Sequence, residues 1–414
     1  MRDPSGPASV LDEVLEYNRD RNPKLVRLKL RRMAKDPFSF FRGTDHLFAR
    51  RWDRLAPPDV GPSVLLCGDL HLENFGAYRT ADGDFLYDIN DFDEALVAPC
   101  SLDLVRCTTS ILLAAQNWKQ TPVQAMRNLL AFLDRYRTTV AKAVRTGRVG
   151  EMALGTARGP VWELLQRPSR GGRAGSLDDV TERSGGTARR IERTSGRFRD
   201  VGSGREKRVR EAVEGYGKDQ GEPGPFRVLD VAFRIAGTGS LGLERYAVLV
   251  RDARSPGPGR DRILDIKETR PSALLACAGD EVQPHGGESD ARRVVRAQQQ
   301  LQARPASGLD VIEVEGQSYR LRELVPEENR TGLDQLRTRP RRLRRAVAIA
   351  GRLTAWAHVR GSRLDGSDRS QALKGWAEGP GLDAVIASAI RYADRTRRDY
   401  KAFRVAVAEN LRPG

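Results

Sequence analysis

The decisive stretch of the sequence is Cys67-Gly68-Asp69-Leu70-His71-Leu72-Glu73-Asn74-Phe75-Gly76, followed closely by the acidic run Asp88-Ile89-Asn90-Asp91-Phe92-Asp93-Glu94-Ala95. The first stretch begins where the apolar run 64–67 stops, so Asp69 is expected on a turn that leaves a strand. The acidic run follows a second strand candidate, residues 85–87. Phosphotransferases hold a nucleotide's magnesium with an Asp, an Asn and a further Asp, each beside a short strand.

This spacing predicts a role for each polar side chain. We expect Asp69 to accept the proton of a substrate hydroxyl. Asn74 and Asp91 would hold Mg²⁺, with Asp93 as the next metal ligand. Asp88, in register with the strand, and Asp103, in the first turn of the next helix, are expected to be structural, the latter bracing the Asp69 loop. The alternative is an acidic hairpin in which Gly, Asp and Asn only form turns.

Length and composition limit the classes of protein that fit. The chain has 414 residues, enough for two or three domains, and no stretch approaches the roughly 20 apolar residues of a membrane helix. The four cysteines show no C-x-x-C spacing, and no apolar run follows the N-terminus, so a cytoplasmic protein is expected. The net charge of +16 allows nucleic-acid binding, but the arginine-rich runs lack interleaved aromatic residues, so nucleic acid is not favoured as the main partner. An anionic substrate, or an arginine-rich bias of the proteome, explains the charge as well.

A second motif lies in the β-rich region. A strand candidate, residues 228–235, runs into Gly237-Thr238-Gly239-Ser240-Leu241-Gly242, and a second strand, 243–250, follows. A dinucleotide-binding fingerprint would open a helix instead, whereas strand, glycine loop and strand is the hairpin that covers ATP phosphates in kinases. We expect Gly237, Gly239, Ser240 and Gly242 to contact the nucleotide. The alternative is a tight hairpin without a ligand.

The next strand supports the kinase-like interpretation. By alternation, Lys267 projects from the side of the strand opposite Leu264 and Ile266, as a lysine that pairs with nucleotide phosphates would. A helix over 289–302 and two strands, 310–314 and 318–324, complete the order of a kinase small lobe. In that order residues 322–325, with Glu323, would form the hinge that meets the adenine. The acid that pairs with the lysine is left open among Glu268, Glu288 and Asp290.

The sequence divides into five parts. We expect an N-terminal helical segment (1–60), the part of a large lobe that carries the catalytic and metal loops (61–150), a Gly/Ser/Arg-rich insertion or linker (151–225), a β-rich small lobe (226–330), and C-terminal helices that complete the large lobe (331–414).

The motifs resemble the catalytic and metal loops of aminoglycoside- and choline-kinase-like phosphotransferases. More closely, residues 38–43, 67–76, 88–95, 237–242, Lys267-Glu268 and Trp356-Ala357-His358 resemble the bacterial family called domain of unknown function 2252. The resemblance covers most of the chain and implies an α+β, protein-kinase-like, two-lobed fold. It implies Asp69 as base, Asn74 and Asp91 on the metal, and Lys267 on the phosphates.

The chain departs from the kinase pattern in two ways. Cys67 stands where kinase-like loops usually have a histidine. The small-lobe elements also follow the catalytic loop, which implies a circular permutation, with the helix over 341–358 ending near Asp69. The expected function is ATP- and Mg²⁺-dependent phosphoryl transfer to an unidentified hydroxyl acceptor, more plausibly a small molecule than a protein. The alternatives are a nucleotide-binding regulatory protein with little catalysis and a basic nucleic-acid-binding protein.

Overall fold

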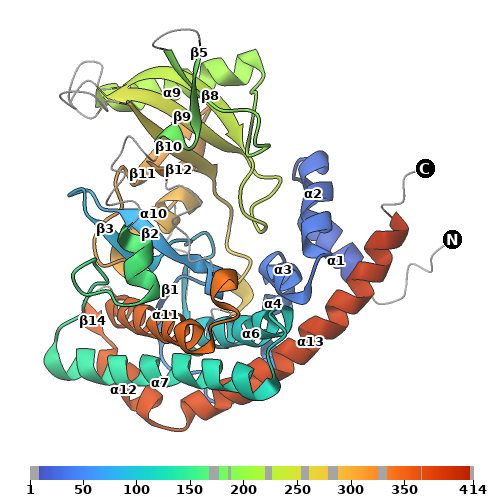
Figure 1. Cartoon of the computed structure of the whole chain (residues 1–414), viewed down its shortest axis with the longest axis vertical. Coiled ribbons are helices and arrows are strands. Elements are labelled where there is room, and N and C mark those ends of the chain that lie inside the picture. The colour runs from blue at the N-terminus through green and yellow to red at the C-terminus, as the bar shows by residue number, and fades with distance from the viewer. Residues whose placement is uncertain are drawn as a thin grey trace.

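A six-stranded antiparallel sheet, in the order β11-β12-β10-β9-β8-β7, forms one end of the molecule (Figure 1). The computed structural model describes residues 9–166, 177–184, 188–219, 226–252, 261–277, 288–324, 333–364 and 366–410. The sheet strands are β7 (Phe198–Arg199), β8 (Phe226–Arg234), β9 (Arg245–Asp252), β10 (Asp261–Glu268), β11 (Asp310–Val314) and β12 (Gln317–Glu323). Together with the helices below, they make a mixed α+β structure.

Alternation along β10 gives the sheet two different faces, as the sequence predicts. Leu264 and Ile266 are buried in an apolar cluster beneath α9 (Ser203–Asp219). Asp265 and Lys267 project from the opposite face, where Asp265 bonds to arginines of β8, β9 and β12.

The β-rich part begins before residue 226, which differs from the division expected from the sequence. β7 pairs with β8, and α9 buries Val209 and Val213 against the sheet. The hairpin β5 (Thr181–Ser184) and β6 (Ala188–Ile191) packs beside them. The physical reason is that the apolar face of the sheet needs a cover, and two well-spaced valines in a charged helix suffice. The expected Gly/Ser/Arg-rich stretches 170–176 and 185–187 lie outside the described residues.

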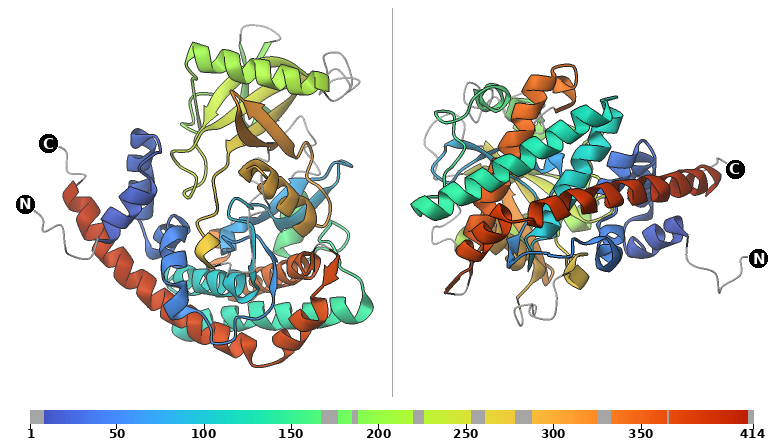
Figure 2. Two further views of the ribbon diagram at one scale, coloured as in Figure 1. Left: turned by 180° about the vertical axis from the view of Figure 1, so that it is seen from behind. Right: turned by 90° about the horizontal axis from the view of Figure 1, so that it is seen from below.

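Helices form the other end of the molecule (Figures 1 and 2). They are α6 (Ser101–Asn117), α7 (Pro122–Thr146), α11 (Pro340–Gly361), α12 (Ser370–Glu378) and α13 (Gly381–Asn410). Segments distant in sequence therefore share one apolar core. No helix among the described residues combines the length and apolar character needed to cross a membrane.

The N-terminal segment packs along the far end of α13. It contains α1 (Val10–Tyr17), α2 (Pro23–Met33), α3 (Pro37–Arg42), α4 (Asp45–Arg50) and α5 (Trp52–Leu55). Leu11 and Val14 of α1 share a buried cluster with Phe403 and Val407 of α13. As a result α2 lies at the side of the molecule, reaching toward the loop between β8 and β9.

Short elements connect the two ends. The pairs are β1 (Ser63–Leu66) with β4 (Leu96–Pro99), β2 (Phe75–Arg79) with β3 (Phe85–Ile89), and β13 (Arg363–Leu364) with β14 (Ser367–Asp368), and α10 (Asp290–Leu301) lies between sheet and helices. The end of α11 lies against β1, where a Cβ at Gly361 would overlap the Leu65 carbonyl oxygen. The helix expected to end near Asp69 therefore does so.

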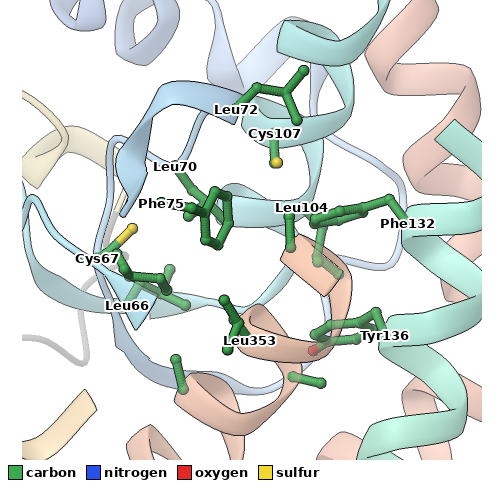
Figure 3. Close-up of a cluster of buried hydrophobic side chains, with 14 of the residues drawn as sticks. Leu66, Cys67, Leu70, Leu72, Phe75, Leu104, Cys107, Phe132, Tyr136 and Leu353 are labelled. Carbon is green, nitrogen blue, oxygen red and sulfur yellow. The ribbon is translucent and has the colours of Figure 1, made fainter. Parts of the chain in front are cut away.

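The loop after β1 rests on a buried apolar cluster. Figure 3 shows its members: Leu66, Cys67, Leu70, Leu72, Phe75, Leu104, Cys107, Phe132, Tyr136 and Leu353. They come from the Asp69 loop and its flanking strands, from α6 and α7, and from α11. This packing fixes the backbone that carries Asp69 to three helices.

The close approach of α7 and α11 predicts a strong stability effect at Gly351. A Cβ there would overlap the carbonyl oxygen of Phe132, so Gly351→Ala should lower the free energy of unfolding by about 1–3 kcal/mol. The matched control is Gly375→Ala in α12, where no atom lies within 4 Å of the added Cβ. That variant should gain roughly 0.5–1 kcal/mol. Urea unfolding measures both, and equal effects at the two positions would contradict this packing.

Candidate functional site

A cavity lies where the sheet faces the helical end, and most of the predicted site residues line it. They are Asp69, Asn74, Asp91, Asp93, Gly237, Gly239, Ser240 and Lys267. The cavity encloses about 90 Å³, less than the roughly 300 Å³ at the lower end of ligand pockets. The two motifs predicted separately from the sequence thus line one cavity.

Asp69 is held by a buried arginine that the sequence analysis missed. The Arg106 Nε donates to Asp69 Oδ1 at 2.6 Å, and Arg106 also pairs with Asp45. The side-chain amide of Asn74 donates to the Asp69 backbone oxygen. Arg106 is buried in α6, and the available signal was a single basic residue in a helix whose other residues, apart from Asp103, carry no charge.

The charges around Asp69 oppose one another. Burial raises the pKa of Asp69 well above its usual value, and the carboxylates of Glu94 and Asp91 raise it further. The guanidinium groups of Arg42 and Arg106 favour the ionised form. A carboxylate with a raised pKa is a stronger base than one in water, which suits proton abstraction.

Arg42 lies at the end of α3 and lines the same cavity. Its Nη1 is 2.5 Å from Glu73 Oε2, and its Nε is 3.4 Å from His71 Nε2. The His71 Nε2 in turn lies 3.8 Å from Asp69 Oδ2. Arg42 therefore holds the polar side chains of the loop instead of standing free in solvent.

Asp103 braces the Asp69 loop, as predicted. Its carboxylate accepts hydrogen bonds from the backbone amides of Cys67 (3.2 Å) and Gly68 (3.0 Å). His358 at the end of α11 places its Nε2 3.3 Å from the same carboxylate, and the Tyr136 hydroxyl lies 2.9 Å from His358 Nδ1. His358, from a helix distant in sequence, therefore contacts Asp103, which holds the Asp69 loop. Within the loop itself, Cys67 stands at the position where kinase-like loops usually have a histidine.

Lys267 pairs with the acidic run, not with the expected helix. Its Nζ forms an ion pair with Asp93 and lies 3.8 Å from Asp91 Oδ1. The three acids considered from the sequence bond elsewhere: Glu288 pairs with Arg296, Asp290 with Arg293, and Glu268 with Arg270. The lysine therefore joins the sheet directly to the loop after β3.

The two carboxylates of the acidic run differ in their surroundings. Asp91 has a side chain that is 52% exposed, whereas that of Asp93 is 25% exposed. Desolvation raises the pKa of Asp91, but Lys267 and the nearby arginines lower it more, so the net pKa lies below the usual value. Asp91 is thus ionised at neutral pH and open to a cation in the cavity.

The cavity offers oxygen ligands of the chemical type that magnesium binds. Among the described residues no three His, Cys, Asp or Glu side chains gather closely enough to hold a metal. Amide oxygens extend the donor set: Asn74 lines the cavity, and the buried Oδ1 of Asn90 has no hydrogen-bond partner in the described part of the chain. Such hard oxygens, with the Asp91 carboxylate, are ligands that Mg²⁺ prefers.

Asp88 is structural, as expected. Its carboxylate accepts from the backbone amides of Ile89 (2.9 Å) and Ala303 (3.2 Å), and it lies outside the cavity lining. Burial raises its pKa to about 6.

The cavity face of the sheet carries a buried charge cluster that the sequence did not reveal. Asp265 is fully buried and bonds to Arg234 (2.9 Å), to both Nε and Nη2 of Arg245 (2.7 Å each), and to Arg320 (2.9 Å). Burial would raise the pKa of Asp265, but these guanidinium groups lower it well below its usual value. Single charged residues in four separate strands give no sequence signal of their convergence.

The glycine loop between β8 and β9 is held by side chains of α2 and by Arg21, which precedes that helix. The Gly239 carbonyl accepts from Arg21 (2.6 Å) and Lys29 (2.8 Å), and the Gly237 carbonyl accepts from Arg32 (2.8 Å). Gly237 has a φ of +76° and Gly242 a φ of +96°, which only glycine adopts without strain. Gly242 faces the Arg21 side chain and lies outside the cavity lining.

Glu323, expected at the hinge, does not line the cavity. Its carboxylate accepts from Ser307 Oγ (2.7 Å), and its backbone amide donates to the Ser307 carbonyl (3.0 Å). The Leu324 amide donates to the Ile263 carbonyl (2.8 Å), so the amides of Glu323 and Leu324 are both used within the fold. The rest of the expected hinge, from residue 325, lies outside the described residues.

Comparison with known proteins identifies a family. A family model described as "Uncharacterized protein conserved in bacteria (DUF2252)" matches residues 21–406. The chain belongs to this family. The match extends from Arg21 through the Asp69 loop, Lys267 and His358, and it confirms the family resemblance predicted from these motifs. No curated protein and no solved structure matches the chain.

The brace at Asp103 predicts a loss of stability when its charge is removed. Asp103→Asn places an amide against two backbone N–H groups, and lost hydrogen bonds to a charged group cost about 1.5–3 kcal/mol. The control is Asp134→Asn in α7, whose side chain is 62% exposed and pairs only with Arg137 on its own helix. It should change stability by less than about 0.5 kcal/mol. A similar small change at Asp103 in urea unfolding would argue against the brace.

Proposed function

We propose that this protein is an ATP- and Mg²⁺-dependent phosphotransferase that acts on a small-molecule hydroxyl acceptor. The observation that carries the proposal is the ion pair between Lys267 and Asp93, with Asp91 and Asp69 in the same cavity. A strand lysine beneath a glycine loop and a catalytic Asp with an acidic metal loop are the two halves of a kinase-like site. They lie about 175 residues apart in sequence, and their meeting supports a shared function.

The chain's own side chains suggest how such a site would work. Bound ATP·Mg²⁺ would supply the phosphoryl group. Lys267 would pair with its phosphates, and Asp91, with Asn74, would hold the metal. The Asp69 carboxylate would accept the proton of the acceptor hydroxyl, while Arg106 holds that carboxylate in place. Positioning and charge neutralisation supply most of the catalysis in phosphoryl transfer.

We further propose that the fold is a circularly permuted, two-lobed kinase-like fold. The six-stranded sheet would be the small lobe and the helical end the large lobe. The contact of His358 with Asp103, and of Gly361 with Leu65, supports this, because α11 ends beside the strand that enters the Asp69 loop. A chain that joined α11 directly to β1 would have the element order of an ordinary kinase.

A nucleotide requires the cavity to open. The enclosed volume of about 90 Å³ is too small for ATP, and α2 holds the glycine loop down through its carbonyl groups. The proposal therefore includes a movement of the loop, or of α2 with it, when nucleotide binds. Lids of this kind are common where phosphoryl transfer must exclude water.

Nucleotide binding is tested by thermal shift. At about 100-fold excess over Kd, ATP with Mg²⁺ should add roughly 3 kcal/mol of stability. Lys267→Met should lose this shift, because it removes the cation that meets the phosphates. NAD is the control ligand for the dinucleotide alternative. If ATP with Mg²⁺ did not raise the melting temperature, or if NAD raised it more, the proposed ATP site would be refuted.

The roles of the three acids separate by mutation. Asp69→Asn should keep nucleotide affinity and reduce turnover by a factor on the order of 10²–10⁴, since it removes the base. Asp91→Asn should weaken Mg²⁺-dependent nucleotide binding, and Asp88→Asn is the control that should do neither. Wild-type turnover should rise with pH, because only ionised Asp69 accepts a proton and its pKa is raised.

Calorimetric titration and ATP consumption with a panel of alcohols measure these effects. If Asp88→Asn abolished the Mg²⁺ dependence of nucleotide binding and Asp91→Asn changed it only slightly, Asp88 and not Asp91 would be the metal ligand. Unchanged turnover in Asp69→Asn would refute the catalytic role. Tight ATP binding without turnover on any acceptor would instead indicate a nucleotide-responsive regulatory protein.

A further inference from the structure

Two buried cations of the N-terminal segment line the cavity without a carboxylate partner. Lys29 is 1% exposed and Arg21 is 8% exposed. The Lys29 Nζ donates to Asn18 Oδ1 (3.1 Å) and to the Gly239 carbonyl (2.8 Å). Arg21 donates to the carbonyls of Gly239 and Leu241, and its Nε has no hydrogen-bond partner among the described residues.

The other buried cations around the cavity differ from these two. Arg106 pairs with Asp45 and Asp69, Arg245 with Asp265, and Lys267 with Asp93. No described carboxylate lies within ion-pair distance of Lys29 or Arg21, and both contact only neutral oxygens. Burying a cation without an anion costs several kcal/mol. Burial accordingly lowers the pKa of Lys29 well below its usual value. Two buried basic side chains without an anionic partner at the wall of a cavity would be stabilised by a bound anionic ligand.

The position of these cations favours the acceptor over the phosphate donor. The carboxylates of Glu94 and Asp69 are those that raise the pKa of Lys29, against the larger effect of burial, whereas the Lys267 Nζ pairs with Asp93 and lies 3.8 Å from Asp91 Oδ1. The helix α2, which carries Lys29, lies at the side of the molecule with α1 and α13 (Figures 1 and 2). An anionic group on this wall would lie on the Asp69 side of the cavity, where the proposed base meets the hydroxyl.

The aromatic ring of Tyr17 also forms part of this wall of the cavity. It lines the cavity at the end of α1, and the Arg21 guanidinium lies 5.3 Å from its ring centroid. The ring of His46 stacks on that of Tyr17, with 4.1 Å between the ring centroids. The stacked rings fix Tyr17, and through it Arg21, so the wall is rigid before a ligand arrives.

We infer that Arg21 and Lys29, with Tyr17, form an anion-binding subsite, and that the acceptor carries a carboxylate or phosphate group beside the hydroxyl that is phosphorylated. The inference rests on the proposed function for the hydroxyl transfer, but the subsite itself does not. The same contacts fasten the glycine loop. An anion that takes these donors from the Gly239 carbonyl would release the loop, and acceptor binding would thereby favour opening of the cavity.

The probe is inorganic phosphate, titrated calorimetrically into the full chain at constant ionic strength without nucleotide. Wild type should bind one phosphate. Lys29→Met and Arg21→Gln should each weaken binding about tenfold or more, because each removes a charged donor. The matched controls on α2 are Lys24→Met and Arg27→Gln, whose side chains are exposed. They should bind like wild type, and circular dichroism checks the fold of each variant.

Lys267→Met separates the two sources of the anion. It should retain phosphate binding if the anion site belongs to the acceptor. Binding that is lost in Lys267→Met and kept in Lys29→Met and Arg21→Gln would place the anion at the donor phosphates and overturn the inference. Absence of phosphate binding to wild type would also overturn it. Lys29-dependent phosphate binding without any ATP·Mg²⁺ shift would instead refute the proposed function and leave the subsite standing.

Discussion

The ion pair between Lys267 and Asp93 is the contact on which the cavity depends. It joins β10 of the six-stranded sheet to the loop after β3, and it brings the glycine loop over the helical end that carries Asp69. Because the pair is largely buried, removing one partner would leave an uncompensated charge that costs about 3–5 kcal/mol. In the proposed function, a phosphate group of the nucleotide would replace Asp93 as the partner of the lysine.

A second set of contacts closes the cavity from the opposite side. Lys29 and Arg32 of α2, together with Arg21 just before that helix, hold the carbonyl groups of the glycine loop, and α1 anchors this segment to α13. The N-terminal segment therefore acts as a clasp on the loop. Opening must break several hydrogen bonds to charged donors at once, which favours two discrete arrangements over a gradual one. A ligand that binds both α2 and the sheet would couple donor and acceptor binding.

Strand alternation and helix-turn position were enough to predict the features that depend only on neighbouring residues in the sequence. Alternation placed Lys267 and the apolar pair Leu264 and Ile266 on opposite faces of β10, and the helix turn at Asp103 was recognised as a brace. The sequence did not reveal the contacts between segments that are distant along the chain. Arg106 on Asp69 and Asp93 on Lys267 join elements far apart in the chain, so no spacing encodes them. The cover that α9 gives the sheet was hidden by its charged composition, and Glu323 was placed by an element order that cannot show where a side chain points.

The central claim is that ATP and a divalent cation bind between Lys267 and the Asp69 loop. A crystal structure of the protein grown with a non-hydrolysable ATP analogue and Mn²⁺ tests it most directly, because anomalous scattering locates the metal. The account predicts Mn²⁺ on the Asp91 carboxylate, phosphates beside Lys267 and beneath the glycine loop, and a cavity wider than the 90 Å³ of the closed form. A nucleotide bound elsewhere, or an intact pair of Lys267 and Asp93 with no metal at Asp91, would contradict it.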